Sequence, residues 1–349
     1  MVFPKDIQER RWFKIVMQLQ PVLALLGALL ITSLVLLTSD TNPIEVFRVL
    51  VVGAFSTPIK ISDTIALTTP LLLCATGLVI TFAAGMYNLG VEGQMAMGAV
   101  GAMAVTRMLE TAPPPLVWAL ALLGGILGGA IWAIIVACLK LFGRISEIFA
   151  GMGLNFLATG VCLYLVFGPW KRPGTASMSG TQPLPEHLWL PTLSGLRLAP
   201  LGPILALIAL AIVWFVLART KWGLSIRAIG NNMNASERMG IPSTRRMIEA
   251  LACCGALAGL AGALQVLAVF HTLIPNISSG IGLLALLVVL LANTRAAWIL
   301  PISVLFAVFT VGSTQLPLTL QIDSSISGVL QGALVLTALA LRGLKSNKA

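Results

Sequence analysis

The stretch LVWALALLGGILGGAIWAIIVACL, residues 116–139, carries no charged side chain over its whole length. As an α-helix it would extend roughly 36 Å, which is enough to cross the hydrocarbon core of a bilayer. The rest of the chain is similar, since 58% of its 349 residues are apolar, 10% are charged and the mean hydropathy is +0.97. A soluble domain carries roughly 25% charged residues. The sequence therefore predicts an all-α polytopic membrane protein.

Apolar runs of this kind recur along the whole chain. A transmembrane barrel would instead show alternating segments of about 10 residues, which the sequence lacks. We therefore predict about ten transmembrane helices with both termini on the same side of the membrane. The eighth run is short for a straight span, so it is tilted, broken or partly re-entrant. The runs lie near residues 15–38, 64–84, 87–108, 116–139, 147–168, 202–218, 248–270, 281–294, 297–314 and 325–341.

The formal charge of +10 is explained by topology. With the N-terminus inside, 16 of the 22 Lys and Arg residues fall in inner segments and 6 in outer segments, as the positive-inside rule requires. Nucleic-acid binding thereby loses its main support, and both termini are predicted to be cytoplasmic. The run at 15–38 is too long for a signal peptide and is predicted to be a retained first span. The predicted layout is one transmembrane domain over 1–349, with cytoplasmic segments 1–14, 219–247 and 342–349 and a periplasmic loop 169–201.

Motifs for catalysis are absent from the sequence. It contains no phosphate-binding G-x-x-x-x-G-K-[ST] loop and no H-E-x-x-H metal motif. The two histidines, His187 and His271, lie far apart, and the five cysteines sit in apolar runs without metal-type spacing. We therefore predict no catalytic residue, no metal site and no cofactor in this chain, which disfavours a membrane-embedded enzyme.

The stretch GMYNLGVEGQMAMG, residues 85–98, places polar side chains inside a predicted span. If residues 87–101 are helical, Asn88 and Glu92 share one face and glycines line the other. A charged acid at the bilayer centre costs roughly 2.5–3.5 kcal/mol on insertion scales, so Glu92 should face protein or water or be protonated. It is either a pathway residue hydrogen-bonded with Asn88 or part of a buried polar clamp. We assign Gln94 and Asn155 to the same candidate set.

The inner segment contains a short predicted helix, NASERMG, residues 234–240. Asn234 is a suitable N-cap, Glu237 completes a capping-box-like pair and Gly240 can close the C-terminus. Pro242 then prevents the helix from continuing. The segment is either a rigid knob for a cytoplasmic partner or an ordinary ordered loop.

Four stretches of the sequence carry a resemblance to a known family. RTKWGLSIRAIGNNMNASERMGI, residues 219–241, resembles the cytoplasmic loop of membrane subunits of bacterial ABC importers in the branched-chain amino acid/simple sugar permease group, and GALAGLAGA, residues 255–263, looks like the small-residue helix that follows it. GMYNLGVEGQ is similar to a signature of the nucleoside-type permeases, as is the segment from Glu147 to Pro173, although Phe156 stands where that group has Tyr. The resemblance thins after residue 275.

The resemblance implies a transport subunit that is not itself an enzyme, in the bacterial inner membrane. ATP and Mg would be bound by a separate ABC ATPase, a second permease subunit would complete a heterodimer, and an extracytoplasmic solute-binding protein would deliver a nucleoside or, as second choice, a simple sugar. Membrane lipid is the remaining partner, and no nucleic acid is expected. The coupling residues for the ATPase would be Arg227, Gly230, Asn232, Asn234, Ala235, Ser236, Glu237, Arg238, Met239 and Gly240.

Two alternatives stay open. Trp170, Lys171 and Arg172 either contact the binding protein or anchor the loop in the aromatic belt of the membrane. An ion-coupled secondary transporter is the rival class of protein. Such carriers place several ionisable side chains within spans, and here Glu92 and Glu249 are the only candidates.

Overall fold

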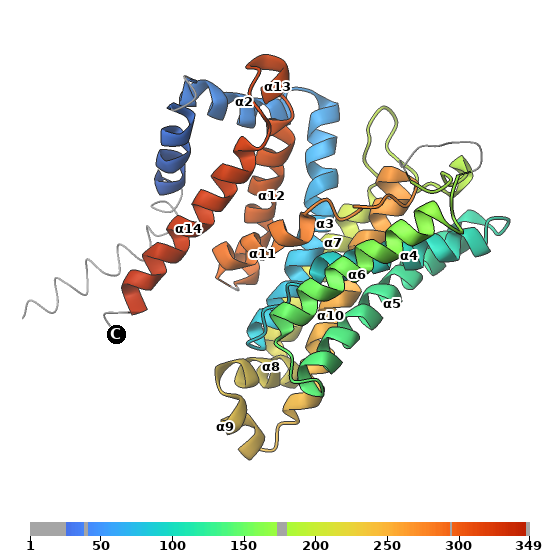
Figure 1. Ribbon diagram of the computed structural model, residues 1–349, viewed down its shortest axis with the longest axis vertical. Helices are drawn as coiled ribbons and strands as arrows, with labels where there is room; N and C mark the ends of the chain where they lie inside the picture. Colours follow the sequence, from blue (N-terminus) through green and yellow to red (C-terminus); the bar gives the residue numbers. More distant parts are fainter. Residues whose placement is uncertain (1–25, 38–40, 173–179, 294, 347–349) are drawn as a thin grey trace, which may run out of the picture. The chain divides into compact units, whose positions relative to one another are not determined.

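The computed structural model describes residues 26–37, 41–172, 180–293 and 295–346, with side chains as far as residue 340. All the regular secondary structure in these ranges is helical, apart from one isolated bridge between Lys171 and Thr181, which confirms the predicted all-helical class (Figure 1). The segment 1–14 and part of the predicted span 15–38 lie outside the described residues. So do the side chains of the tail 342–349.

The chain forms two compact units, Thr57–Ala307 and Met1–Ser56 with Val308–Ala349. The larger unit begins where Thr57 caps a helix by accepting a hydrogen bond from the Lys60 backbone N–H, followed by Pro58 at the first helical position. Its helices are α3 Pro58–Ala83, α4 Val91–Met108, α5 Pro114–Leu141, α6 Glu147–Phe167, η1 Glu186–Leu188, α7 Leu201–Arg219, α8 Lys221–Asn231, α9 Met233–Arg238, α10 Ser243–Leu264, the π-helical η2 Gln265–Phe270 and α11 Ile281–Ala292.

The smaller unit contains a helix that the apolar runs did not predict, α2 Pro43–Phe55. Asn42 caps it by accepting a hydrogen bond from the Ile44 backbone N–H. The other helices here are Leu26–Leu37, α13 Leu316–Thr319 and α14 Ile326–Ser346. The helix α12, Ala296–Ser313, runs across the boundary between the two units.

Within the described residues, six helices are long and apolar enough to cross a membrane: Pro58–Ala83, Pro114–Leu141, Glu147–Phe167, Leu201–Arg219, Ser243–Phe270 and Ala296–Thr319. They correspond to six of the ten predicted runs. The total of about ten spans and the side on which the termini lie stay predictions. The eighth run forms α11, which has only 12 residues and is flanked by Gly280 and Asn293 in the left-handed region (φ 79° and 53°). It is therefore a short helix that left-handed residues bound at both ends.

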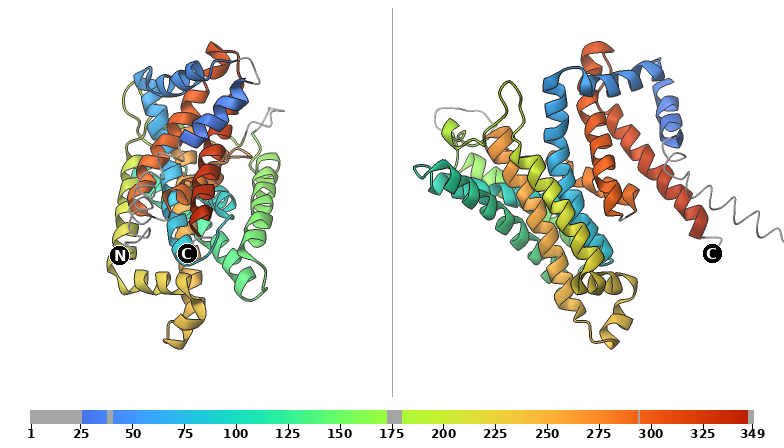
Figure 2. Two further views of the ribbon diagram at one scale, coloured as in Figure 1. Left: turned by 90° about the vertical axis from the view of Figure 1, so that its left-hand side faces the viewer. Right: turned by 180° about the vertical axis from the view of Figure 1, so that it is seen from behind.

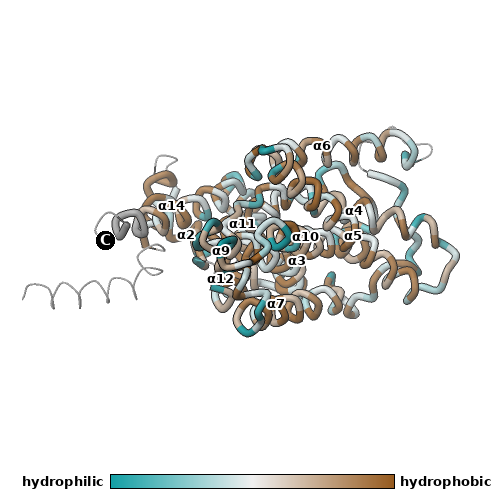
Figure 3. Tube along the Cα trace, turned by 90° about the horizontal axis from the view of Figure 1, so that it is seen from below, coloured by the Kyte–Doolittle hydropathy of each residue, from teal (hydrophilic) through white to brown (hydrophobic). Residues whose placement is uncertain are grey.

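The helices α4, α5 and α10 form the tightly packed centre of the larger unit. Small residues allow this approach: a side-chain carbon added to Gly259 of α10 would lie 3.0 Å from the Cα of Gly129 in α5. This confirms the predicted small-residue packing of 255–263. The outward sides of α5, α6 and α7 expose Leu127, Leu157 and Ile212, and these helices are mostly apolar in Figure 3.

The two long polar segments lie at opposite ends of α10. The helices α8 and α9 immediately precede its N-terminus, and α9 forms one tip of the larger unit (Figure 2). At the other end, Leu190 N donates to Leu267 O and Thr181 N donates to Leu273 O, both at 3.0 Å. One face of this unit therefore carries α8 and α9, and the opposite face carries the 180–200 segment.

Candidate functional site

The chain reverses direction between α3 and α4 in a turn that holds a buried amide pair. Asn88 Nδ2 donates to Gln94 Oε1 at 3.0 Å, and Gln94 Nε2 donates back to Asn88 Oδ1 at 3.1 Å. Both side chains are fully buried, and Asn88 also bonds Gly90 N (3.1 Å) and Cys254 Sγ (3.2 Å). The pair thus joins the turn, α4 and α10, as a polar clamp does.

The structure corrects the prediction that Asn88 and Glu92 share a helix face. The helix α4 begins only at Val91, because the chain turns through Gly85 (φ 74°) and Asn88 lies in the turn. Glu92 is therefore not hydrogen-bonded to Asn88. Its Oε1 accepts from Leu283 N at 3.0 Å, in the first turn of α11.

Asn155 connects α6 to the start of α4. Its Oδ1 accepts from Gly93 N at 2.8 Å, and its Nδ2 donates to Leu89 O at 2.9 Å. Gly93 N belongs to the first turn of α4, where backbone donors have no partner within the helix. The Asn155 side chain satisfies one of them and holds α6 beside this turn.

Between α4, α6 and the segment 275–283 lies a cavity of about 400 Å³. The polar and aromatic side chains that line it are Glu92, Asn155, Phe156, Thr159, Asn276 and Ser278. This volume is within the range of small-molecule sites. Glu92 and Asn155 of the predicted set thus line one cavity, whereas Asn88 and Gln94 face each other inside the protein.

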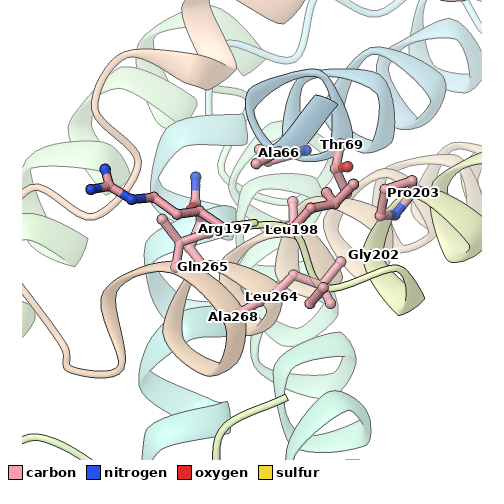
Figure 4. A pocket seen from close by; sticks show the side chains of 13 residues that line it. Ala66, Thr69, Arg197, Leu198, Gly202, Pro203, Leu264, Gln265 and Ala268 are labelled. Atoms are coloured by element: carbon pink, nitrogen blue, oxygen red, sulfur yellow. The ribbon is translucent and has the colours of Figure 1, made fainter. Parts of the chain in front are cut away.

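A second cavity lies between α3, α7 and the end of α10 (Figure 4). It measures about 20 Å³, which is room for about one water molecule. Gln265 of the π-helical segment lines it, and its Oε1 has no partner among the described residues. This space is too small for a solute, whereas the cavity beside Glu92 is large enough to be a candidate cargo site.

The inner helix α9 starts two residues earlier than predicted. Its N-cap is Asn232, whose Oδ1 accepts from Ala235 N at 3.0 Å. Asn232 is extended (φ −159°) because α8 ends at Asn231, whereas Asn234 lies inside α9. The prediction of Asn234 as N-cap is wrong for this reason. Glu237 is consequently not at the third helical position, and the predicted capping-box pair is not formed.

The end of α9 is closed as predicted. Gly240 adopts φ 80°, its N–H donates to Glu237 O at 2.9 Å, and Ile241 N donates to Ser236 O at 3.0 Å. These two bonds form the Schellman motif that ends a helix at a left-handed glycine. Exposed side chains of α9 are Asn234, Glu237 and Arg238, followed by Met239.

The helix α8 meets the turn at Gly85 through backbone atoms. A side-chain carbon added to Gly230 would lie 3.0 Å from Gly85 N, and one added to Gly85 would lie 3.1 Å from the Cα of Gly230. Arg227 is exposed on the same helix. The end of α8 is therefore seated directly against the α3–α4 turn.

Glu249 of α10 anchors the inner segment. Its carboxylate accepts from Trp222 Nε1 of α8 at 2.7 Å and pairs with Arg246 (2.7 Å) and Arg245 (2.9 Å). The i+3 and i+4 spacing of the two arginines is visible in the sequence, but the contact with Trp222 is not. We therefore assign Glu249 to the α8–α10 contact and not to ion coupling.

We expect Glu249→Gln to loosen the inner segment while the complex still assembles. Glutamine can still accept from Trp222 but cannot form the two ion pairs, each of which stabilises by up to about 1 kcal/mol. Trypsin cleavage within 219–247 should then accelerate about fivefold, because local opening becomes more frequent. Glu237→Gln, an exposed acid on α9, is the matched control. Equal cleavage rates for the two variants would contradict the role assigned to Glu249.

The outer segment is held by aromatic contacts. The Arg107 guanidinium lies 5.6 Å from the Trp170 ring centroid, and Trp118 Nε1 donates to Leu188 O at 2.9 Å. Trp189 stacks on His271 with centroids 4.0 Å apart. Lys171 and Arg172 are exposed beside Trp170. Trp170 is thus packed on Arg107, while the two cations remain accessible.

His271 makes the packing of this segment sensitive to pH. Burial lowers the pKa of the His271 imidazole, and its carbonyl accepts from Leu184 N at 2.7 Å. Because the pKa of the folded state is lower, the unfolded segment takes up a proton first as the pH falls below about 6.5, the pKa of a free histidine. The folded segment therefore loses stability as the pH falls from that value to the folded pKa, and it loses no more below it. We expect faster hydrogen exchange at Leu184 and Leu190 at pH 5.5 than at pH 7.5, after correction for intrinsic rates.

Two variants test this assignment. His271→Asn keeps a residue that tolerates the left-handed conformation (φ 53°) and should abolish the pH dependence of exchange. His187→Gln replaces the other histidine of the chain, which is exposed. This variant should keep the pH dependence of hydrogen exchange. If hydrogen exchange in His271→Asn still depends on pH, His271 is not the source of that dependence.

The apolar outward faces and the six membrane-length helices of the described residues are typical of a multi-pass membrane protein. The chain belongs to the family of branched-chain amino acid transport system permease components, whose sequence profile matches residues 60–339. It is therefore a permease component of the plasma membrane, and the ion-coupled alternative is not supported.

Three relatives are similar over most of their length. The guanosine ABC transporter permease protein NupP of Bacillus subtilis is 25% identical over 91% of this chain and 92% of its own. NupQ, a guanosine ABC transporter permease protein of the same organism, is 28% identical over 82% and 91%. The putative glucose ABC transporter permease protein TsgC13 of Haloferax volcanii is 31% identical over 77% and 82%.

Proposed function

We propose that the chain is one of two membrane subunits of an ATP-driven importer that moves nucleosides. The observation that carries this proposal is the similarity to NupP and NupQ over most of the chain. These two guanosine permease proteins come from one organism, which supports a heterodimer. The similarity to TsgC13 supports a simple sugar as the second candidate cargo.

ATP and Mg belong, in this proposal, to a separate ATPase subunit that docks on α9. The exposed side chains of α9 are the contact surface, and its two closed ends make it stiff. Stiffness matters because a soft helix would absorb the movement of the ATPase. The residues proposed for docking are Arg227, Gly230, Asn232, Asn234, Ala235, Ser236, Glu237, Arg238, Met239 and Gly240. Of these, Ser236 is fully buried and donates to Asn232 O, so it supports α9 from within and does not contact the ATPase.

The opposite face receives a solute-binding protein. Lys171 and Arg172 are exposed there, and Trp170 is fixed by Arg107. The two positive side chains next to Trp170 suit an acidic surface on the binding protein, because complementary charge speeds association. We propose these three residues as part of that contact.

Uptake by cells that express the complete importer tests the proposal. Labelled guanosine should accumulate, vanadate should abolish accumulation, and a protonophore should not. Glucose uptake without guanosine uptake would select the second candidate. Uptake that a protonophore abolishes and vanadate spares would contradict an ATP-driven importer.

A further inference from the structure

The cavity beside Glu92 lies at the level of the middle of α10. Asn88, in the turn that precedes Glu92, bonds Cys254, and a side-chain carbon added to Gly98, beyond Glu92 on α4, would collide with Gly259. Both α10 residues are central in the candidate span Ser243–Phe270. The cavity thus lies at about half the height of this span, the level at which transporters of other folds hold their cargo.

Glu92 is the only ionisable side chain among the described residues that line this cavity. Its Oε1 accepts from Leu283 N, in the first turn of the short helix α11. First-turn donors of interrupted helices commonly bind an anionic group of the cargo. Here the protein's own carboxylate holds that donor. An incoming carboxylate or phosphate would find no cation in the cavity and would be repelled by Glu92.

The remaining walls of the cavity suit a neutral solute. Ser278 is only 6% exposed, and it lines the cavity. Phe156 is 77% exposed and presents an aromatic ring along the same cavity. Glu92 also lines the cavity, and its Oε1 is the oxygen that accepts from Leu283 N. The cavity therefore offers a ring surface, a hydroxyl and a carboxylate oxygen.

We propose that this cavity is a charge-selective cargo subsite that accepts uncharged solutes with a planar ring and hydroxyl groups. The ring packs on Phe156, and the hydroxyls bond to Glu92 and Ser278. Anions such as nucleotides, and amino acids with their carboxylate, are rejected. This inference rests on the proposed function and specifies the chemistry of its cargo.

Protection of an introduced cysteine from alkylation tests the subsite in the assembled importer. Thr159→Cys, which lines the cavity and makes no proposed contact with the cargo, is introduced in a background in which Cys253 and Cys138 are serine. N-ethylmaleimide then labels position 159. Guanosine should slow labelling, whereas guanosine 5′-monophosphate and leucine at equal concentration should not. Tyr164→Cys is the matched control, because Tyr164 is 70% exposed on the same helix but does not line the cavity. Met152→Cys, also exposed and lining the cavity, is the second reporter if Thr159→Cys does not assemble.

Glu92→Gln tests the charge directly. Glutamine can still accept from Leu283 N but no longer repels anions, so the concentration of guanosine 5′-monophosphate needed for protection should fall about tenfold. Three results would overturn the inference: no labelling of either reporter, no protection by guanosine in a complex that imports it, or equal protection by both ligands before Glu92 is changed. A complex that imports glucose alone, with glucose protecting position 159, would instead overturn the nucleoside assignment and leave the selection of uncharged cargo intact.

Discussion

Gly240→Pro should abolish uptake while the importer still hydrolyses ATP. Gly240 adopts φ 80° and donates its N–H to Glu237 O. Proline fixes φ near −65° and has no N–H, and such a replacement costs about 3 kcal/mol. That cost lowers the population of the closed α9 end on the order of a hundredfold. Guanosine uptake and ATP hydrolysis, measured on the same proteoliposomes, should then separate.

A matched replacement controls for general damage to the backbone. Gly195 also has a positive φ, 75°, but lies in the outer segment, so Gly195→Pro should leave coupling unchanged. Exchanging residues 234–239 for a Gly/Ser run should reproduce the effect of Gly240→Pro, because it removes the stiffness of α9 without touching α10. Normal uptake in both inner variants would contradict the docking role of α9.

Asn88→Leu should sharply reduce the amount of assembled complex. The Gln94 side chain would keep its burial but lose both partners, and each unpaired buried polar group costs about 1–3 kcal/mol. The yield of folded protein and its thermal midpoint in detergent measure the loss. Tyr87→Leu changes an exposed neighbour in the same turn and should leave both quantities near normal.

The double variant Asn88→Leu/Gln94→Met separates a clamp from a cargo contact. Removing both members of a buried pair restores much of the stability, because no unpaired side-chain group remains. Recovery should be incomplete, since Gly90 N also loses its partner. A double variant as unstable as the sum of the single ones would show that the pair is not the source of the stability.

The helices were predicted accurately where the length of an apolar run alone decides the structure. Long apolar runs became α3, α5 and α10 because a run of this length can satisfy its backbone only as a helix. The helix α2 was missed because Glu45 and Arg48 interrupt its hydropathy. The short inner helix was recognised, but two asparagines compete as its cap, and the end of α8 decides between them.

The candidate cargo site was predicted in part. Glu92 and Asn155 were selected as polar residues within apolar runs, and both line the cavity. Helical periodicity failed at Asn88, because its place is set by pairing with Gln94 across a turn and with Cys254 far along the chain. Ser278 and Phe156 gave no local signal, since their role depends on segments far apart in the sequence. The stacking of Trp189 on His271 was hidden for the same reason.

The contact between Gly85 and Gly230 has a mechanical consequence. Because main chain meets main chain there, no side chain can change rotamer to take up a displacement. A displacement of α8 along its axis is therefore transmitted directly to the α3–α4 turn. The same turn leads through the Asn88–Gln94 pair to the first residues of α4, including Glu92. Three consecutive contacts thus connect α8 to Glu92: Gly230 with Gly85, Asn88 with Gln94, and the first turn of α4, which carries Glu92.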